Sequence, residues 1–135
     1  MDQCHHQMAR ALQKDGWQVG KPKAIVYNNS KDIVYIDLEA TYTSNGANVV
    51  YQHIYVEIKC FAPPLNSREL HAALGQYLIY RAVLGRQDTP TALYLAVPEN
   101  AHNDLNEVVQ EVLRENKIKV IVVNLETEKV VKWIE

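Results

Sequence analysis

Hydrophobic positions recur along this chain with two different periods, which predict strands and helices in turn. Residues 33–42 alternate: Ile36, Leu38 and Ala40 fall on one side, and Tyr, Asp and Glu positions fall on the other. Residues 49–61 repeat this pattern, with aliphatic residues and a cysteine on one face and polar or aromatic residues on the other. Both segments are therefore predicted to be strands that bury a single face.

Four further segments are predicted to be strands. Residues 92–97 and 118–123 are continuous apolar runs, as in strands that are buried on both faces. Residues 24–27 are short and β-branched, and residues 130–134 alternate weakly, as expected of an edge strand. The Asn45-Gly46 pair is a strong turn signal and predicts a hairpin between the strands at 33–42 and 49–61.

Helical periodicity and capping residues predict three helices. Asn66 is a suitable N-cap, Glu69 follows at capping-box spacing, and Gly85 is suited to a C-terminal cap. The predicted helices are residues 5–17, 67–84 and 102–116. The resulting element order, α-β-β-β-α-β-α-β-β, predicts an α/β fold in which one mixed sheet has helices on both sides.

Composition narrows the class of protein. A chain of 135 residues with 47% hydrophobic and 22% charged residues fits a single domain, 1–135, rather than a disordered or fibrous protein. The net charge of −2 excludes a polycation that coats nucleic acid, and no apolar run approaches the length of a membrane span. Cys4 and Cys60 are too few for a disulfide framework, so we expect a reducing, cytoplasmic compartment and a core position for Cys60.

The strongest candidate for chemistry is an acidic pair on the predicted hairpin. Asp37 lies on the first strand, Glu57 and Lys59 lie on the second, and the period of two places all three on one face. Two adjacent carboxylates repel unless a cation lies between them, and Mg²⁺ or Mn²⁺ prefers such oxygen ligands. The Ile58 carbonyl is a further candidate ligand, and Lys59 would assist attack on a phosphate.

This arrangement resembles the sequence pattern of PD-(D/E)xK nucleases, which share a restriction-endonuclease-like fold. The resemblance implies a mixed sheet flanked by helices and a Mg-dependent site for phosphodiester hydrolysis. Gln76 and Tyr80 share a helix face and resemble the QxxxY motif of several branches of that superfamily. That resemblance implies that Gln76 approaches Lys59 and that Tyr80 helps to place DNA. The alternative for the Glu-x-Lys triplet is a solvated cross-strand charge pair.

Several other residues compete for roles in this site. Many nucleases of this fold carry an acid on the first helix, where this chain has His5 and His6 instead, so either histidine is a candidate replacement. Asp32 is a rival first acid, although its turn context favours capping. Glu39 is a candidate outer carboxylate. Two residues early in the helix at 67–84 are candidate phosphate contacts, with a solvated first turn as the alternative: Arg68 and His71.

Blocks along almost the whole chain resemble the XisH family, the fdxN-element excision controlling factors of cyanobacteria. These blocks are Lys14-Asp15-Gly16-Trp17, Ile36-Asp37-Leu38, Val56-Glu57-Ile58-Lys59, Ala72-Ala73-Leu74-Gly75-Gln76-Tyr77, Leu93-Tyr94-Leu95-Ala96-Val97-Pro98 and Trp133-Ile134. The resemblance implies an endonuclease-like fold and a role in DNA rearrangement during heterocyst development. It also implies DNA, a site-specific recombinase and an XisI-like companion factor as partners.

Two functional hypotheses follow from the sequence. The first is a metal-dependent DNA endonuclease with Asp37, Glu57, Lys59, Gln76 and Tyr80 in its site, acting as a homodimer if both strands are cut. The second is a catalytically inactive accessory protein that binds DNA or docks the recombinase or the companion factor, with apolar edge residues such as Val130 and Trp133 available for assembly.

Overall fold

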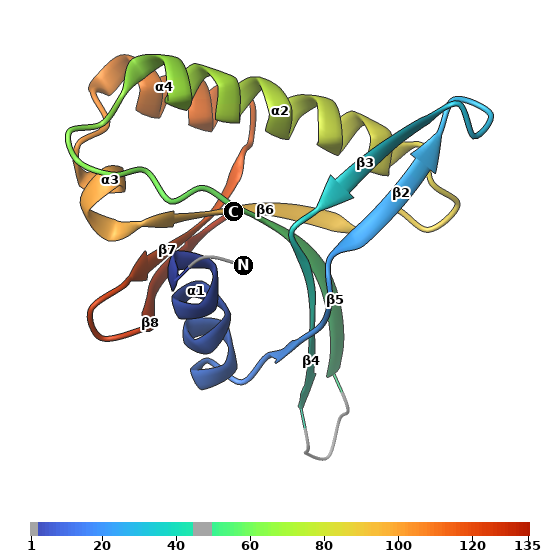
Figure 1. Cartoon of the computed structure of the whole chain (residues 1–135), viewed down its shortest axis with the longest axis horizontal. Coiled ribbons are helices and arrows are strands. Elements are labelled where there is room, and N and C mark those ends of the chain that lie inside the picture. The colour runs from blue at the N-terminus through green and yellow to red at the C-terminus, as the bar shows by residue number, and fades with distance from the viewer. Residues whose placement is uncertain (1–2, 45–49) are drawn as a thin grey trace.

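The computed structural model describes residues 3–44 and 50–135 as a curled mixed sheet with helices on both faces (Figure 1). The helices are α1 (Gln3–Lys14), α2 (Ser67–Gly85), α3 (Glu99–Asn103) and α4 (Glu107–Glu115). The strands are β1 (Gln18–Val19), β2 (Lys23–Tyr27), β3 (Asp32–Ile36), β4 (Leu38–Ser44), β5 (Val50–Ile58), β6 (Ala92–Pro98), β7 (Lys119–Asn124) and β8 (Lys129–Ile134). The predicted α/β class is confirmed.

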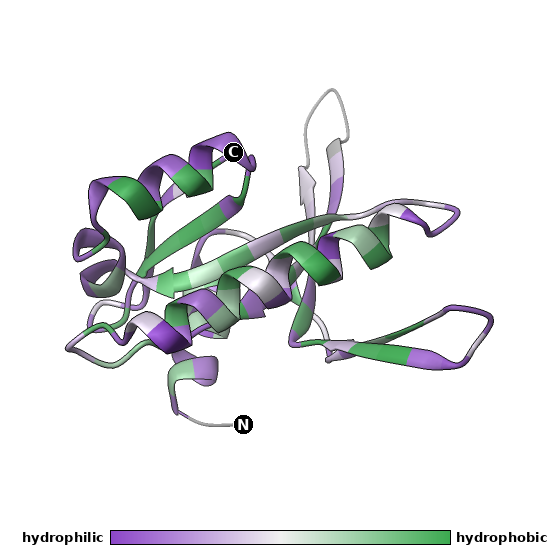
Figure 2. Ribbon diagram, turned by 90° about the horizontal axis from the view of Figure 1, so that it is seen from above, coloured by the Kyte–Doolittle hydropathy of each residue, from purple (hydrophilic) through white to green (hydrophobic). Residues whose placement is uncertain are grey.

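The main sheet has the order β1-β4-β5-β6-β7-β8, and β2 pairs with β3 in a separate two-stranded arm. Strands β5, β6 and β7 are parallel, and the outer pairings are antiparallel. The predicted buried strands β6 and β7 lie in the middle of the sheet, and β8 lies at an edge as expected. The arm projects from the body and carries a hydrophobic stretch, which is green in Figure 2.

Each face of the sheet carries its own hydrophobic core, so β5 is buried on both faces and not on the single face that its alternation predicts. On one side, α1 lies within the curl of the sheet and packs Met8 and Leu12 against Val56 and Ile121. On the other side, α2 packs its apolar stripe against β6 and β7, joined by α4. The Tyr77 hydroxyl donates to the Leu93 carbonyl at 2.7 Å, which anchors α2 to β6.

The segment at residues 33–42 is two strands rather than the predicted single strand. Ile36 pairs with Lys23 in the arm, whereas Leu38 pairs with Val56 in the main sheet. The chain therefore changes sheets at Asp37. Ile36 is buried in the core on the α2 side, whereas Leu38 and Ala40 are buried in the core on the α1 side, so the prediction that all three share one side is wrong. The period of two continues across the break, so the pattern alone does not reveal it. The predicted Asn45-Gly46 turn lies outside the described residues.

The segment at residues 102–116 also departs from the prediction of a single helix. It divides between the end of α3 and α4, because Asn106 leaves the helical conformation and its side chain accepts from the Val109 N–H at 2.9 Å. Val108, which the periodicity placed on the apolar face of this helix, is exposed. For α2 the Asn66 cap is confirmed, but Gly85 is the last helical residue and Arg86 takes the C-cap position.

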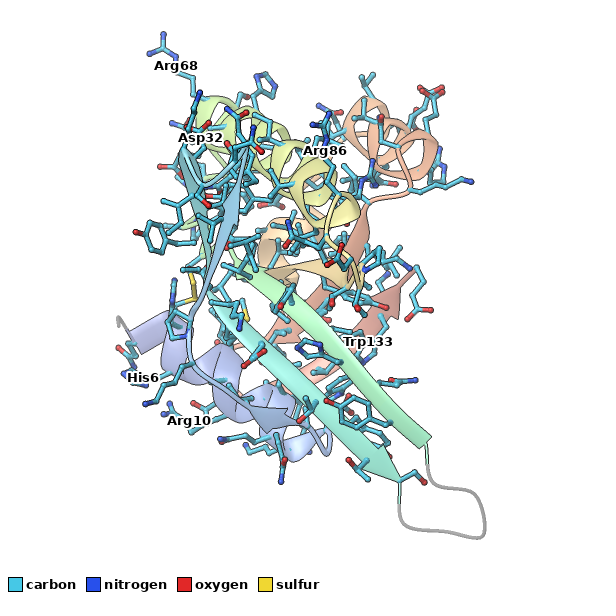
Figure 3. All side chains as sticks on the ribbon, turned by 90° about the vertical axis from the view of Figure 1, so that its right-hand side faces the viewer. His6, Arg10, Asp32, Arg68, Arg86 and Trp133 are labelled. Atoms are coloured by element: carbon cyan, nitrogen blue, oxygen red, sulfur yellow. A yellow bond between two sulfur atoms is a disulfide. The ribbon has the colours of Figure 1, made fainter. Side chains whose placement is uncertain are left out.

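A disulfide joins Cys4 on α1 to Cys60, which lies just beyond the end of β5 (Figure 3). Cys60 packs against the α1-side core, as predicted, but its sulfur is bonded rather than free. The two cysteines are 56 residues apart, and only the folded sheet brings them together. The cysteine count therefore no longer argues for a reducing compartment. No helix in residues 3–44 and 50–135 is long and apolar enough to cross a membrane.

Reduction of this disulfide is expected to lower the free energy of unfolding by about 2–4 kcal/mol, because a cross-link over a long loop restricts the unfolded chain. Urea unfolding with and without dithiothreitol measures the effect. The double variant Cys4→Ser/Cys60→Ser is the control and should be insensitive to the reductant. Equal unfolding midpoints for the wild type in both conditions would contradict the bond's contribution.

Candidate functional site

The carboxylates of Asp37 and Glu57 each accept a hydrogen bond from a backbone N–H at the point where the chain changes sheets. The Asp37 N–H donates to Oε1 of Glu57 at 2.9 Å, and the Ile58 N–H donates to Oδ2 of Asp37 at 2.7 Å. The N–H of Asp37 takes no part in the hydrogen-bond ladder of either sheet. The Glu57 carboxylate therefore satisfies a donor that the strand break leaves without a backbone partner. The break and the acidic pair are therefore one structural feature.

Glu57 is buried, with 3% of its surface exposed. Among the described residues it is the only buried one with a charged side chain. Burial is the main cause that raises the pKa of Glu57 from its ordinary value of 4.5 to about 7, and the charge of Asp37 raises it further. The hydrogen bond from the Asp37 N–H and the charge of Lys59 act in the opposite direction. Near neutral pH the Glu57 carboxyl is therefore poised to lose its proton.

Lys59 lies beside this pair at the end of β5. Its Nζ is 4.0 Å from Oε2 of Glu57, and its backbone N–H donates to the Ala96 carbonyl of β6 at 3.0 Å. Lys59 and Gln76 line the same pocket of about 380 Å³ between the end of β5 and α2. Gln76 donates from Nε2 to the Tyr80 hydroxyl at 3.0 Å, so the two residues of the QxxxY pattern bind each other.

The same pocket contains groups that the sequence did not assign to a site. Glu69, for which the sequence suggested only a capping role, lines the pocket from α2, and Cys60 lines it from the strand end. The spacing of Glu69 and Gln76 over two helical turns was an available signal, since it places both on one face. The disulfide therefore ties α1 to the wall of this pocket.

The structure places the competing residues elsewhere. Asp32 accepts from Asn28 Nδ2 at 2.8 Å in the turn of the arm, which supports its predicted turn role (Figure 3). Glu39 bonds to His53 across β4 and β5 at 3.0 Å, in a different pocket. Three of the remaining candidates from the sequence are exposed: His6, Arg68 and His71. The fourth, His5, is half-buried.

The residues of the pair fit a hard divalent cation in part. Each carboxylate accepts one backbone hydrogen bond, through Oε1 of Glu57 and Oδ2 of Asp37. Two carboxylates with one lysine at 4.0 Å leave negative charge for a cation to balance. No group of three His, Cys, Asp or Glu side chains gathers in residues 3–44 and 50–135, so waters would complete the coordination, as Mg²⁺ allows.

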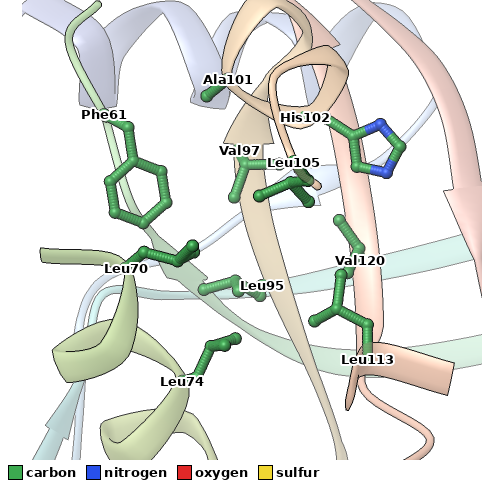
Figure 4. A pocket seen from close by; sticks show the side chains of 10 residues that line it. All are labelled: Phe61, Leu70, Leu74, Leu95, Val97, Ala101, His102, Leu105, Leu113 and Val120. Carbon is green, nitrogen blue, oxygen red and sulfur yellow. The ribbon is translucent and has the colours of Figure 1, made fainter. Parts of the chain in front are cut away.

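A second cavity, between α2 and α4, does not qualify as a site. It is lined by aliphatic residues, Phe61 and His102, and its volume is about 20 Å³ (Figure 4). A cavity of this size holds about one water molecule. It is a packing gap in the core on the α2 side of the sheet.

The fold and the site together define a mixed α/β protein with an acidic pair and a lysine at the end of a central strand. The chain belongs to the XisH family: the family model, described as XisH protein, matches residues 1–131. No curated protein matches the chain.

Two solved structures are similar over almost the full length. The chain is 30% identical to an XisH family protein from Nostoc punctiforme PCC 73102, with a TM-score of 0.82 and coverage of 99% of this chain and 100% of that one. It is 31% identical to an fdxN element excision controlling factor protein from Anabaena variabilis, with a TM-score of 0.78 and coverage of 98% of both chains.

The raised pKa of Glu57 predicts a pH dependence of stability in the metal-free protein. Between pH 4.5 and about 7 the folded state keeps a proton that the unfolded chain has lost. This contribution to the free energy of unfolding therefore falls as pH rises through that window, by about 3 kcal/mol. Glu57→Gln keeps an oxygen for the Asp37 N–H and removes the titration.

Urea unfolding at pH 5 and pH 8 compares the wild type with Glu57→Gln and with Glu69→Gln, a matched control on the exposed side of the pocket. The Glu57 variant should gain stability relative to the wild type as pH rises, and the Glu69 variant should follow the wild type. Parallel pH profiles for the wild type and Glu57→Gln would refute the buried titration.

Proposed function

We propose that this protein hydrolyses phosphodiester bonds in DNA with a Mg²⁺ or Mn²⁺ ion held by Asp37 and Glu57. The observation that carries the proposal is that backbone N–H donors hold the two carboxylates together next to Lys59, which lines a pocket of about 380 Å³. The Ile58 carbonyl is the third proposed protein ligand. When bound, the ion would polarise a phosphate oxygen and lower the pKa of an attacking water.

The residues of this chain have separate roles in the proposed reaction. Lys59 would hold a non-bridging phosphate oxygen or orient the attacking water, because its ammonium group lies 4.0 Å from Glu57 in the pocket. Gln76 would position Lys59 from α2. Tyr80, which accepts the hydrogen bond from Gln76, would fix the amide and contact DNA beyond it. Asp37 and Glu57 hold their geometry through backbone donors before any substrate arrives.

The family suggests where this chemistry is used. The relative from Anabaena variabilis is described as an fdxN element excision controlling factor. We propose the same general role here: control of DNA element excision during heterocyst development, in the cytoplasm, together with a site-specific recombinase and an XisI-like factor. A homodimer would supply two sites if both strands are cut.

A non-catalytic accessory role is the second candidate, and the arm favours it. Val26, Ile33 and Tyr35 on the outer face of β2 and β3 are 52%, 45% and 64% exposed. Exposed apolar residues on a projecting arm are typical of protein interaction surfaces. In this role the protein would bind DNA or dock a recombinase or companion factor, and the acidic pair would act only in the fold.

Cleavage of a supercoiled plasmid with Mg²⁺ or Mn²⁺ separates the two roles. The endonuclease hypothesis predicts metal-dependent nicking that EDTA abolishes and that Lys59→Met reduces by about 100-fold or more, with an unchanged circular dichroism spectrum. Lys129→Met, an exposed lysine at the start of β8, is the matched control and should cleave at the wild-type rate.

Equal cleavage by Lys59→Met and the wild type would rule out the proposed site. No cleavage by the wild type, together with DNA binding that weakens steeply with salt, would favour the accessory role through phosphate contacts. A pull-down that recovers a companion factor but no DNA would favour the docking role.

A further inference from the structure

A separate pocket of about 380 Å³ lies on the opposite face of the sheet from Glu57. It begins where α1 ends: Asp15 and Trp17 follow the helix directly, and the other lining residues come from β4, β5, β6 and the C-terminal end of the chain at β8. The concave face of the sheet is covered by α1 only in part. The pocket occupies the concave face beyond the end of the helix.

Aromatic rings form half of the lining of this pocket. Trp17 contacts Tyr42 and Trp133 with ring centroids 5.5 and 5.4 Å apart, and Tyr94 meets Trp133 edge-to-face at 5.2 Å. The four rings, from the segment after α1 and from β4, β6 and β8, thus line one space. The faces of such rings carry negative potential, which attracts cations.

Two carboxylates accompany these rings. Asp15 accepts from the Trp133 indole N–H at 3.2 Å, and Glu135 accepts from the Tyr94 hydroxyl at 2.6 Å. Each carboxylate retains further acceptor capacity, and none of the eight lining residues is basic. Lys119, which is not among the lining residues, has its Nζ 5.6 Å from the centroid of the Tyr94 ring. This ring therefore already has a cation as a partner.

We propose that this pocket binds an organic cation of the quaternary or methylated ammonium class. Such a group is too large and too weakly hydrated for a carboxylate alone, and it gains most from several ring faces together with nearby negative charge. A phosphate or a nucleic acid backbone would be repelled by Asp15 and Glu135. The cation is either a free small molecule or a methylated lysine side chain of a peptide, and both present the same chemistry.

The two tryptophans make the pocket directly measurable. The chain contains two Trp residues, Trp17 and Trp133, and both line this pocket. Tryptophan fluorescence therefore reports on this space alone. The probes are choline, a short peptide containing trimethyllysine, and 3,3-dimethylbutanol, which has the shape of choline without its charge.

We expect a saturable fluorescence change with choline, the trimethyllysine peptide or both, and binding of the neutral isostere weaker by about tenfold or more. Binding of choline alone indicates a small-molecule ligand, and binding of the peptide alone indicates a modified side chain. The double variant Asp15→Asn/Glu135→Gln should weaken cation binding by about tenfold, and Asp32→Asn in the arm, the matched control, should not.

Two results would overturn the proposal. One is the absence of saturation with both cations up to about 100 mM, which is weaker than any specific site of this kind. The other is equal binding of choline and its neutral isostere by the wild type, which would indicate an apolar pocket without charge recognition. A near-ultraviolet circular dichroism spectrum of the double variant checks that the ring cluster is intact.

Discussion

Two hydrogen bonds, from the Asp37 N–H to Glu57 and from the Ile58 N–H to Asp37, fix the geometry of the whole site. The chain leaves the arm and enters the main sheet at Asp37, and its N–H would have no partner there without the Glu57 carboxylate. An unsatisfied buried donor costs about 1–3 kcal/mol, so the fold itself retains a buried acid at this point. The same bonds bring Asp37 to the end of β5, where Lys59 begins the wall of the pocket.

The hydrogen bond from the Asp37 N–H explains why the fold retains a buried carboxylate at Glu57 although its ionisation is unfavourable. A carboxylate that is 3% exposed and next to a second carboxylate is costly to ionise. The pair lies next to Lys59, whose Nζ is 4.0 Å from Glu57 and which lines an open pocket of about 380 Å³. Perturbed carboxyl groups in open pockets are typical of functional sites, although structural networks also produce them.

Much of the fold could be predicted from the sequence, and the failures have clear causes. Period-two alternation is a local signal, and it predicted strand conformation at residues 33–42, although as one strand. The hairpin expected between residues 33–42 and 49–61 placed Asp37 near Glu57. The break at Asp37 depends on which strands pair, and alternation does not encode pairing partners. The split of the helix at residues 102–116 did have a local signal, the Asn106 cap, which the longer apolar pattern concealed. The Cys4–Cys60 bond depends on where α1 lies against the sheet, and no spacing rule gives that.

Crystals grown with Mn²⁺ and measured at a wavelength where manganese scatters anomalously test directly whether Asp37 and Glu57 hold a divalent metal ion. We predict an anomalous peak within bonding distance of both carboxylates in the wild type, and its loss in Glu57→Gln. A map with no peak there at about 10 mM Mn²⁺, with the carboxylates still bonded to the Asp37 and Ile58 N–H groups, would contradict it and leave the acidic pair a purely structural device.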